Sequence, residues 1–154
     1  MRRLSGFLLA GAMLLLPALH GDGGLNAQEK KELTFDGDTA IITVAIRPDK
    51  TADFEQIMKD VSAALMKSDK PERKQQAAGW KVVKGTTPLK DGNIVYMHVI
   101  DPVVKGADYT ILTILYEGNT DPNAQRAFFE KYRDSFAAGL GGGAFTNAVD
   151  LSKP

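Results

Sequence analysis

His98 is the residue of this 154-residue chain best suited to acid–base chemistry. It lies in residues 93–103 (NIVYMHVIDPV), where a strand is expected, on the same strand face as Tyr96. An imidazole titrates near neutral pH, so His98 is a candidate general base or a sensor of acidification. The alternative is a hydrogen-bonded histidine of the core or of an interface.

Aromatic residues on neighbouring strands point to a second kind of chemistry, the binding of a small ligand. Trp80 and Tyr96 fall on adjacent expected strands, and with Thr43 and His98 they are candidates to line an apolar pocket. Such a pocket would take a small apolar or aromatic molecule. Packing in the core is the competing explanation for these side chains.

The composition excludes several classes of site. The chain has no cysteine, which rules out disulfides, thiolate metal ligands, a cysteine nucleophile and a lipid-modified cysteine. With so few histidines we expect no metal and no cofactor. The 19 basic and 19 acidic residues provide no electrostatic drive toward nucleic acid or anionic lipid.

Other polar groups have simpler interpretations. Asp101 and Asp108 are expected to be turn and cap residues. Residues 139–143 lack the lysine and the following helix of a phosphate-binding loop, so they are expected to form a hinge. The charged run at residues 67–74 (KSDKPERK) is interpreted as a solvated helix connection, with a polyanion-binding patch as the alternative.

Residues 1–27 have the pattern of a cleavable signal peptide. Arg2 and Arg3 precede an uncharged apolar run, and Ala27 provides a small residue for cleavage. The apolar run is shorter than the roughly 20 residues of a spanning helix, although a retained anchor is the alternative. We expect a periplasmic or secreted protein that leaves the membrane after cleavage. Cleavage would remove Arg2, Arg3 and Asp22 and would leave 17 basic and 18 acidic residues. His98 would then be the one remaining histidine.

The rest of the chain is expected to form a flexible leader at residues 28–38 and one domain at residues 39–152. Strands are predicted at residues 39–47, 80–84, 93–103 and 144–151, the middle two joined as a hairpin by the turn at residues 90–93. Helices are predicted at residues 52–67, 72–77 and 122–138, capped by Thr51 at the first and Asp121 at the last. Residues 107–117 fit a strand or a helix, and their flanking glycines favour a helix.

This order of elements, βαββαβ, predicts an α+β domain of the ferredoxin-like plan, with an antiparallel sheet and helices on one face. Residues 94–100 are apolar on both strand faces, whereas a sheet covered on one side should be polar on the other. We therefore expect a homodimer packed sheet to sheet, with Tyr96 and His98 on the inner face.

The opening ITVAIRPDK followed by TADFEQIMKDV resembles the start of dimeric α/β-barrel proteins, the group of the antibiotic-biosynthesis monooxygenase domains. The segments SDKPERKQQAAGWKVVKG and VIDPVVKGADYTILTILYEG are similar to stretches of uncharacterised exported bacterial proteins. The first resemblance implies the topology and a dimeric barrel. Neither provides a catalytic motif that can be transferred residue by residue.

The leading hypothesis is an exported, dimeric domain that binds a small ligand between its sheet and its helices, and is not an enzyme. One alternative is a cofactor-independent enzyme, oxygenase-like or isomerase-like, that uses His98 as base. The other is a structural or interaction domain with a filled interior.

Overall fold

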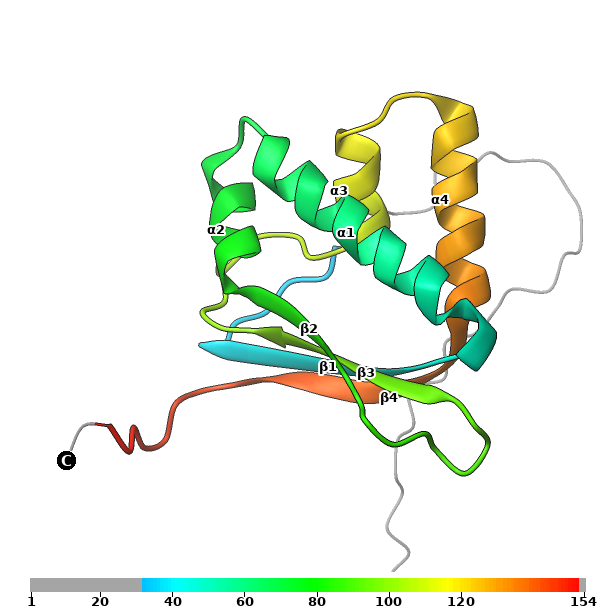
Figure 1. The fold of residues 1–154 in the computed structure, drawn as a ribbon. Helices are drawn as coiled ribbons and strands as arrows, with labels where there is room; N and C mark the ends of the chain where they lie inside the picture. Colours follow the sequence, from blue (N-terminus) through cyan, green and yellow to red (C-terminus); the bar gives the residue numbers. More distant parts are fainter. Residues whose placement is uncertain (1–31, 153–154) are drawn as a thin grey trace, which may run out of the picture. The chain divides into compact units, whose positions relative to one another are not determined.

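The structure is a computed structural model that describes residues 32–152. It is an α+β domain in which a four-stranded antiparallel sheet carries all its helices on one face (Figure 1). The predicted signal peptide and the first residues of the predicted leader lie outside the described residues. Within the described part, no helix is long and apolar enough to cross a membrane.

The sheet contains β1 (Thr39–Ile46), β2 (Trp80–Lys84), β3 (Ile94–Ile100) and β4 (Phe136–Phe145) in the order β2-β3-β1-β4. Every neighbouring pair is antiparallel. The predicted hairpin is confirmed, since β2 pairs with β3 and places Trp80 opposite Ile100. This arrangement is compatible with the ferredoxin-like plan expected from the order of elements.

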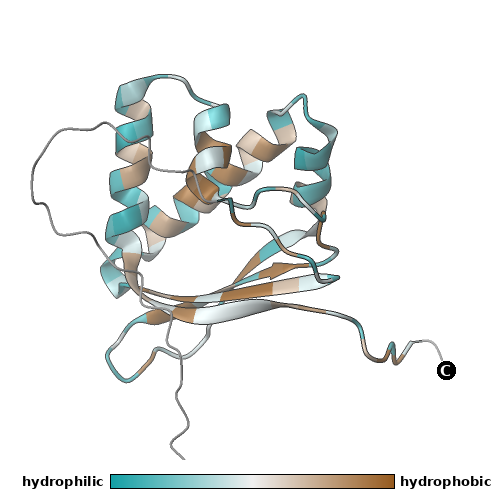
Figure 2. Cartoon of the chain, turned by 180° about the vertical axis from the view of Figure 1, so that it is seen from behind, coloured by the Kyte–Doolittle hydropathy of each residue, from teal (hydrophilic) through white to brown (hydrophobic). Residues whose placement is uncertain are grey.

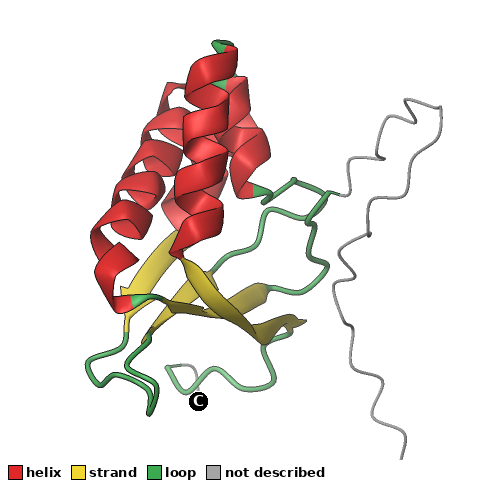
Figure 3. Ribbon diagram, turned by 90° about the vertical axis from the view of Figure 1, so that its right-hand side faces the viewer, coloured by secondary structure: helices red, strands yellow, loops and turns green. Residues whose placement is uncertain are grey.

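The helical layer consists of a short 3-10 helix, η1 (Pro48–Lys50), followed by α1 (Thr51–Lys67), α2 (Pro71–Gly79), α3 (Ile111–Glu117) and α4 (Pro122–Ser135). The apolar stripe of α1 is buried, as its spacing predicts, with Phe54 packed against the sheet and the rest of the stripe packed mainly against α3. Figure 2 shows brown hydrophobic segments alternating with teal hydrophilic ones along the helices. Figure 3 shows the two layers edge-on.

One of the two predicted helix caps is present in the structure, and the other is not. Asp121 caps α4, because its carboxylate accepts from the Asn123 N–H at 3.1 Å. The prediction that Thr51 caps α1 is wrong, since Thr51 is itself the first residue of that helix. The turn of η1 already leads the chain into α1, so the helix begins without a side-chain cap. Residues 111–117 are helical, as their flanking glycines indicated, and residues 107–110 are not.

The C-terminal strand differs most from the prediction. α4 ends at Ser135, three residues earlier than expected, and β4 runs through the glycine cluster that was predicted to be a hinge. Strand pairing explains the difference, because β4 pairs with β1 over most of its length. A side chain at Gly142 would collide with the backbone oxygen of Ile41, so glycine permits this close approach. The predicted strand at residues 144–151 ends at Phe145.

The end of the predicted leader packs onto the domain. Phe35 is buried against Tyr109, with their ring centroids 5.5 Å apart. The Leu33 carbonyl accepts from the Tyr109 N–H at 2.8 Å, and its N–H donates to the Asp108 carboxylate at 3.0 Å. The described part of residues 28–38 is thus held by core contacts rather than flexible, because Phe35 has an apolar site to fill.

Alternation along the strands assigns a face to each residue. On β3, Tyr96, His98 and Ile100 are buried beneath the helices. Val95, Met97 and Val99 therefore point to the opposite side, which we call the open face. Both sides of β3 are apolar, as expected, but the structure places Tyr96 and His98 under the helices and not on the face available to a second sheet.

Candidate functional site

The structure brings three of the four predicted site residues together beneath α1. Trp80 begins β2, and its indole Nε1–H donates to His98 Nδ1 at 3.2 Å. Tyr96 lies two residues before His98 on β3, and Phe54 of α1 packs edge-on against both rings. The constellation is therefore a packed aromatic cluster of the core, held by one internal hydrogen bond.

His98 is only 2% exposed, and its surroundings oppose a charge on the ring. Burial lowers the pKa of His98 to about 4, because desolvation penalises the imidazolium form. The prediction that His98 titrates near neutral pH is therefore wrong. Since Nδ1 accepts the hydrogen bond from the indole N–H, the neutral ring carries its own proton on Nε2. This arrangement favours a structural hydrogen bond over a general base that exchanges protons with a substrate.

Tyr96 takes part in a second polar group at the rim of the core. Its hydroxyl donates to Glu55 Oε1 at 2.6 Å, and the Lys84 ammonium donates to the same oxygen at 2.9 Å. The hydrogen bond from Tyr96, followed by that from Lys84, lowers the pKa of Glu55. Burial, followed by the bond to Glu55, raises the pKa of Tyr96. Glu55 is thus an ionised acceptor that ties β2 and β3 to α1.

Thr43 lies away from the other predicted site residues. It pairs directly with Met97 on β3, and directly paired residues share a face of the sheet. Thr43 therefore belongs to the open face, whereas Tyr96 and His98 lie on the other side. The prediction that Thr43 lines one pocket with Trp80 is wrong, because the register of β1 turns the partly buried Ile42 and the buried Val44 toward the helices instead.

The space beside Trp80 is small. A cavity of about 50 Å³ lies between α1, α2 and β2, lined by Met58, Val61, Ser62, Leu65, Ala77, Trp80 and Val82. This volume is far below the roughly 300 Å³ at which small-molecule pockets begin. The space beside Trp80 is therefore too small for a ligand of that size.

A larger hollow lies at the far end of the helical layer. A cleft of about 640 Å³ opens where α1 and α3 end and α2 begins, with α4 forming one wall. Apolar side chains from α1, α3 and α4 line it, namely Ala63, Ala64, Ile114, Leu115 and Phe128. Charged residues of both signs surround them, namely Asp60, Lys67, Asp69, Lys70, Arg73 and Glu117. The volume of the cleft lies within the range of small-molecule sites.

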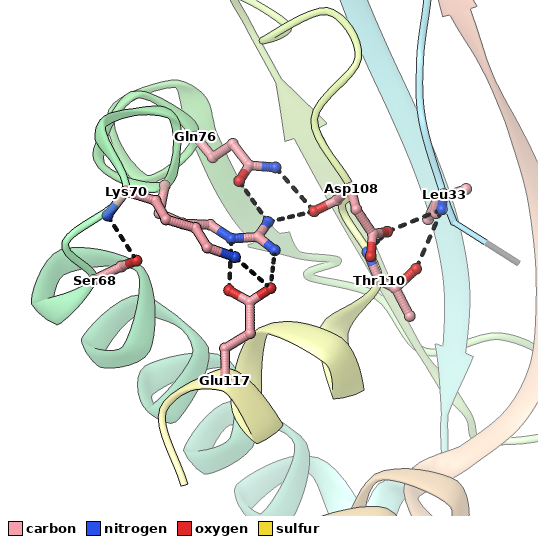
Figure 4. A network of polar contacts seen from close by, with 8 residues as sticks. Leu33, Ser68, Lys70, Gln76, Asp108, Thr110 and Glu117 are labelled. Atoms are coloured by element: carbon pink, nitrogen blue, oxygen red, sulfur yellow. Dashed lines mark hydrogen bonds and ion pairs between the residues drawn. The ribbon is translucent and has the colours of Figure 1, made fainter. Parts of the chain in front are cut away.

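Arg73 lines the polar side of the cleft and is only 5% exposed. Figure 4 shows the polar network to which it belongs, with Gln76, Asp108 and Glu117 labelled. The Arg73 Nε and Nη2 donate to the two oxygens of Glu117 at 3.1 and 2.8 Å. Its Nη1 donates to the Gln76 side chain and to the Asp108 carbonyl. The guanidinium is thus held on three sides, in the bidentate geometry that fixes an arginine most firmly.

Glu117 is held by a second cation, since the Lys70 ammonium lies 3.2 Å from its Oε1. The hydrogen bond from Arg73 lowers the pKa of Glu117, and the contact with Lys70 acts in the same direction. Glu117 remains 32% exposed on its side chain, so it faces the cleft. The arrangement can position a ligand by charge and hydrogen bonds, but the described residues hold no cluster of three metal-ligating side chains.

The sequence hypothesis missed this cleft for an identifiable reason. The run at residues 67–74 was interpreted as a solvated connection, and Lys67, Asp69 and Lys70 are indeed exposed. Arg73 within that run is buried instead. Its partners Glu117 and Asp108 come from a segment more than 30 residues away in the chain. An arginine on the inner side of a short helix was the available signal.

The open face of the sheet is the remaining feature. Its side chains are mostly apolar and half-buried or exposed, namely Ile41, Thr43, Val83, Val95, Met97 and Val99. On β4 the same face presents Gly141 and Gly143, which add no side chain, and the half-exposed Phe145, which pairs with Thr39. Lys81 lies at the β2 edge of this face. A flat apolar surface of this kind is typical of a face that packs against another surface.

Comparison with known proteins identifies no relative. No family model matches the chain, no curated protein matches it, and no solved structure matches its fold.

Proposed function

We propose that this chain is an exported, homodimeric domain that binds a small apolar or aromatic ligand. The single observation that carries the binding proposal is the cleft of about 640 Å³ with its apolar lining and its buried arginine wall. We place the ligand there, and not beside Trp80, because the cavity at Trp80 measures only about 50 Å³. The ligand's apolar part would lie on Ala63, Ala64 and Phe128, which line the cleft and are at least partly exposed.

The polar wall supports orientation of the ligand rather than its chemical conversion. Arg73 is already bound to Glu117, so it acts as a rigid support. Lys70 is about half exposed and more weakly held, and can turn toward a polar group on the ligand. Binding without turnover is the function that these groups support best, since the buried His98 lies outside the lining of the cleft.

A fluorescent aromatic probe tests this proposal. Anilinonaphthalene sulfonate, which combines an apolar ring system with one polar group, should bind the folded chain with a saturable rise in emission. Ala63→Phe, which places a ring in the cleft, should weaken binding by about tenfold or more. Ala52→Phe on the same helix is the matched control, because Ala52 is also exposed but lies outside the cleft. Equal binding by both variants would rule out the cleft as the site.

The homodimer is proposed on the open face of the sheet. Two antiparallel sheets can pack with their faces about 10 Å apart, and the apolar side chains of both then fill the space between them. This packing would complete the dimeric α/β barrel to which the opening strand and helix bear a resemblance. Light scattering at micromolar concentration should yield twice the chain mass, and Met97→Glu at the centre of the open face should halve it. A monomeric parent chain would contradict the proposal.

A further inference from the structure

Residues 101–110 form a loop between β3 and α3 that is contacted by two other parts of the chain. One is α2. The other is the stretch of residues 33–38 before β1, which we call the N-terminal segment. The Asp38 carbonyl at the end of this segment accepts from the Val103 N–H of the loop at 2.8 Å. The loop therefore depends on two distant segments for its position.

Asp108 is the residue of the loop at which the two sets of contacts meet (Figure 4). Its carboxylate accepts from the Leu33 N–H of the N-terminal segment at 3.0 Å. Its carbonyl accepts from Arg73 Nη1 and, at 3.1 Å, from the Gln76 side-chain amide, both on α2. The side chain of Asp108 thus binds the N-terminal segment, while its backbone binds the arginine that lines the cleft.

The N-terminal segment is fastened to the loop by several contacts. The Leu33 N–H lies 3.2 Å from the Thr110 hydroxyl oxygen, and the Leu33 carbonyl accepts from the Tyr109 N–H at 2.8 Å. Phe35 is 9% exposed and packs against the Tyr109 ring. Backbone hydrogen bonds and one buried ring therefore hold the segment against residues 108–110.

The position of Asp108 matters to the cleft because of Arg73. A guanidinium that is 5% exposed needs acceptors inside the protein, and Arg73 Nη1 has two, the Gln76 side chain and the Asp108 carbonyl. A displacement of the Asp108 backbone would remove one of them and favour a different position of the guanidinium. Glu117 would then shift as well, because it lines the cleft and is held by the same guanidinium.

We infer that Asp108 is a positioning residue of the ligand cleft, and that the N-terminal segment holds it in place. This inference rests on the proposed binding of a ligand in the cleft and adds groups that act on the ligand from outside it. Leu33, Phe35 and Asp108 are not among the described residues that line the cleft. Their effect on a ligand would therefore pass through Arg73 and Glu117.

Substitution of Asp108 in the full chain tests the inference, with anilinonaphthalene sulfonate as the probe. Asp108→Ala removes the acceptor for Leu33 and should raise the dissociation constant of the probe by about fivefold or more. Asp108→Asn retains an oxygen acceptor and should restore binding to within about twofold of the parent value. Where Asp108→Ala does not fold, Thr110→Val serves, because it removes the other acceptor of the same N–H.

Gly142→Ala is the matched control for a loss of stability. Its added methyl strains the contact between β4 and β1, and residue 142 lies outside both the cleft and the loop. This variant should unfold at a lower temperature than the parent chain but bind the probe equally well. If Gly142→Ala and Asp108→Ala weaken binding equally, Asp108 affects only stability and the inference is wrong.

A double variant tests whether Asp108 acts through Arg73. Asp108→Ala added to Arg73→Met should weaken binding no further than Arg73→Met alone, because the group that Asp108 positions is then absent. Additive weakening would contradict the inference.

The same measurements separate failure of the inference from failure of the proposed site. If Ala63→Phe weakens binding of the probe while Asp108→Ala and Thr110→Val keep the parent affinity, the positioning role is wrong and the cleft remains the ligand site. If the parent chain binds no probe, or Ala63→Phe binds it equally well, both proposals are overturned.

Discussion

The Trp80 indole donates its Nε1–H to Nδ1 of the buried His98, so the one histidine of the domain is fixed by the one tryptophan of the chain. The two residues are 18 positions apart, and the β2–β3 hairpin brings them together. The bond occupies one ring nitrogen, and burial opposes protonation of the ring. We therefore expect His98 to affect the stability of the fold rather than catalysis.

Acidification should destabilise the domain through His98. The pKa of His98 is about 4 in the folded chain and about 6.5 when unfolded, so the unfolded state binds the proton more tightly. The stabilisation from the neutral ring is complete above pH 6.5 and is lost as the pH falls toward 4. The loss amounts to about 3 kcal/mol. Urea unfolding at several pH values measures it.

His98→Gln isolates this contribution, because glutamine retains an acceptor for Trp80 but does not titrate. The variant should be less sensitive to pH between 6.5 and 4 than the parent chain. Other groups contribute equally to both chains, so the difference between their pH profiles reports His98 alone. Identical profiles would show that His98 is not the acid-sensitive group.

The Arg73–Glu117 pair should behave as one unit. Glu117→Leu should lower the free energy of unfolding by about 3 kcal/mol, because it leaves the buried Arg73 guanidinium without its carboxylate. Arg73→Met should lower it by less, because Glu117 is about one-third exposed and keeps its contact with Lys70. The double variant should lose less than the sum of the two. Chemical denaturation of all four chains completes the cycle. Additive losses would contradict a coupled pair.

A surface ion pair is the matched control for this cycle. Arg133 and Asp134 lie 2.7 Å apart, and both side chains are about half exposed. Water screens such a pair, so Asp134→Asn should leave the unfolding midpoint unchanged. The nitrogen–oxygen distances of the two pairs are similar, at 2.8 and 2.7 Å. A larger loss of stability at the Arg73–Glu117 pair would therefore be due to its burial.

Two glycines of β4 should tolerate a side chain very differently. Gly142→Ala should destabilise the domain by about 1–3 kcal/mol, because the added methyl meets the Ile41 backbone oxygen. Gly139→Ala should be neutral or slightly stabilising, since nothing lies within 4 Å of the position its Cβ would take. Thermal unfolding of the two variants makes the comparison. Similar midpoints would contradict the close approach of β1 and β4.

Export should remove residues 1–27. The chain produced in a bacterium should be recovered with Gln28 as its first residue, as measured by N-terminal sequencing or intact mass. Ala27→Trp should block cleavage, because signal peptidase requires a small residue at this position. Gln28→Glu should be cleaved normally. Recovery of a parent chain that still contains His20 would support a retained anchor instead.

Local patterns predicted the elements that depend on neighbouring residues. The apolar spacing along α1, the turn between β2 and β3 and the aspartate that caps α4 act within a few residues, so the sequence carries them directly. The glycine cluster shows the limit of such patterns. Glycines 139, 141, 142 and 143 are typical of a hinge by composition, yet pairing with β1 makes this segment a strand.

The sequence by itself excluded any chemistry that needs cysteine. It also predicted that both faces of β3 are apolar, and it predicted the order of strands and helices. Only the tertiary structure decided which face the helices cover, and a shift of one residue in register would exchange the two faces. It placed Thr43 on one side and His98 on the other, lowered the pKa of that histidine by burial, and joined Arg73 to Glu117. Each of these depends on contacts between distant segments, and no local pattern encodes such a distance.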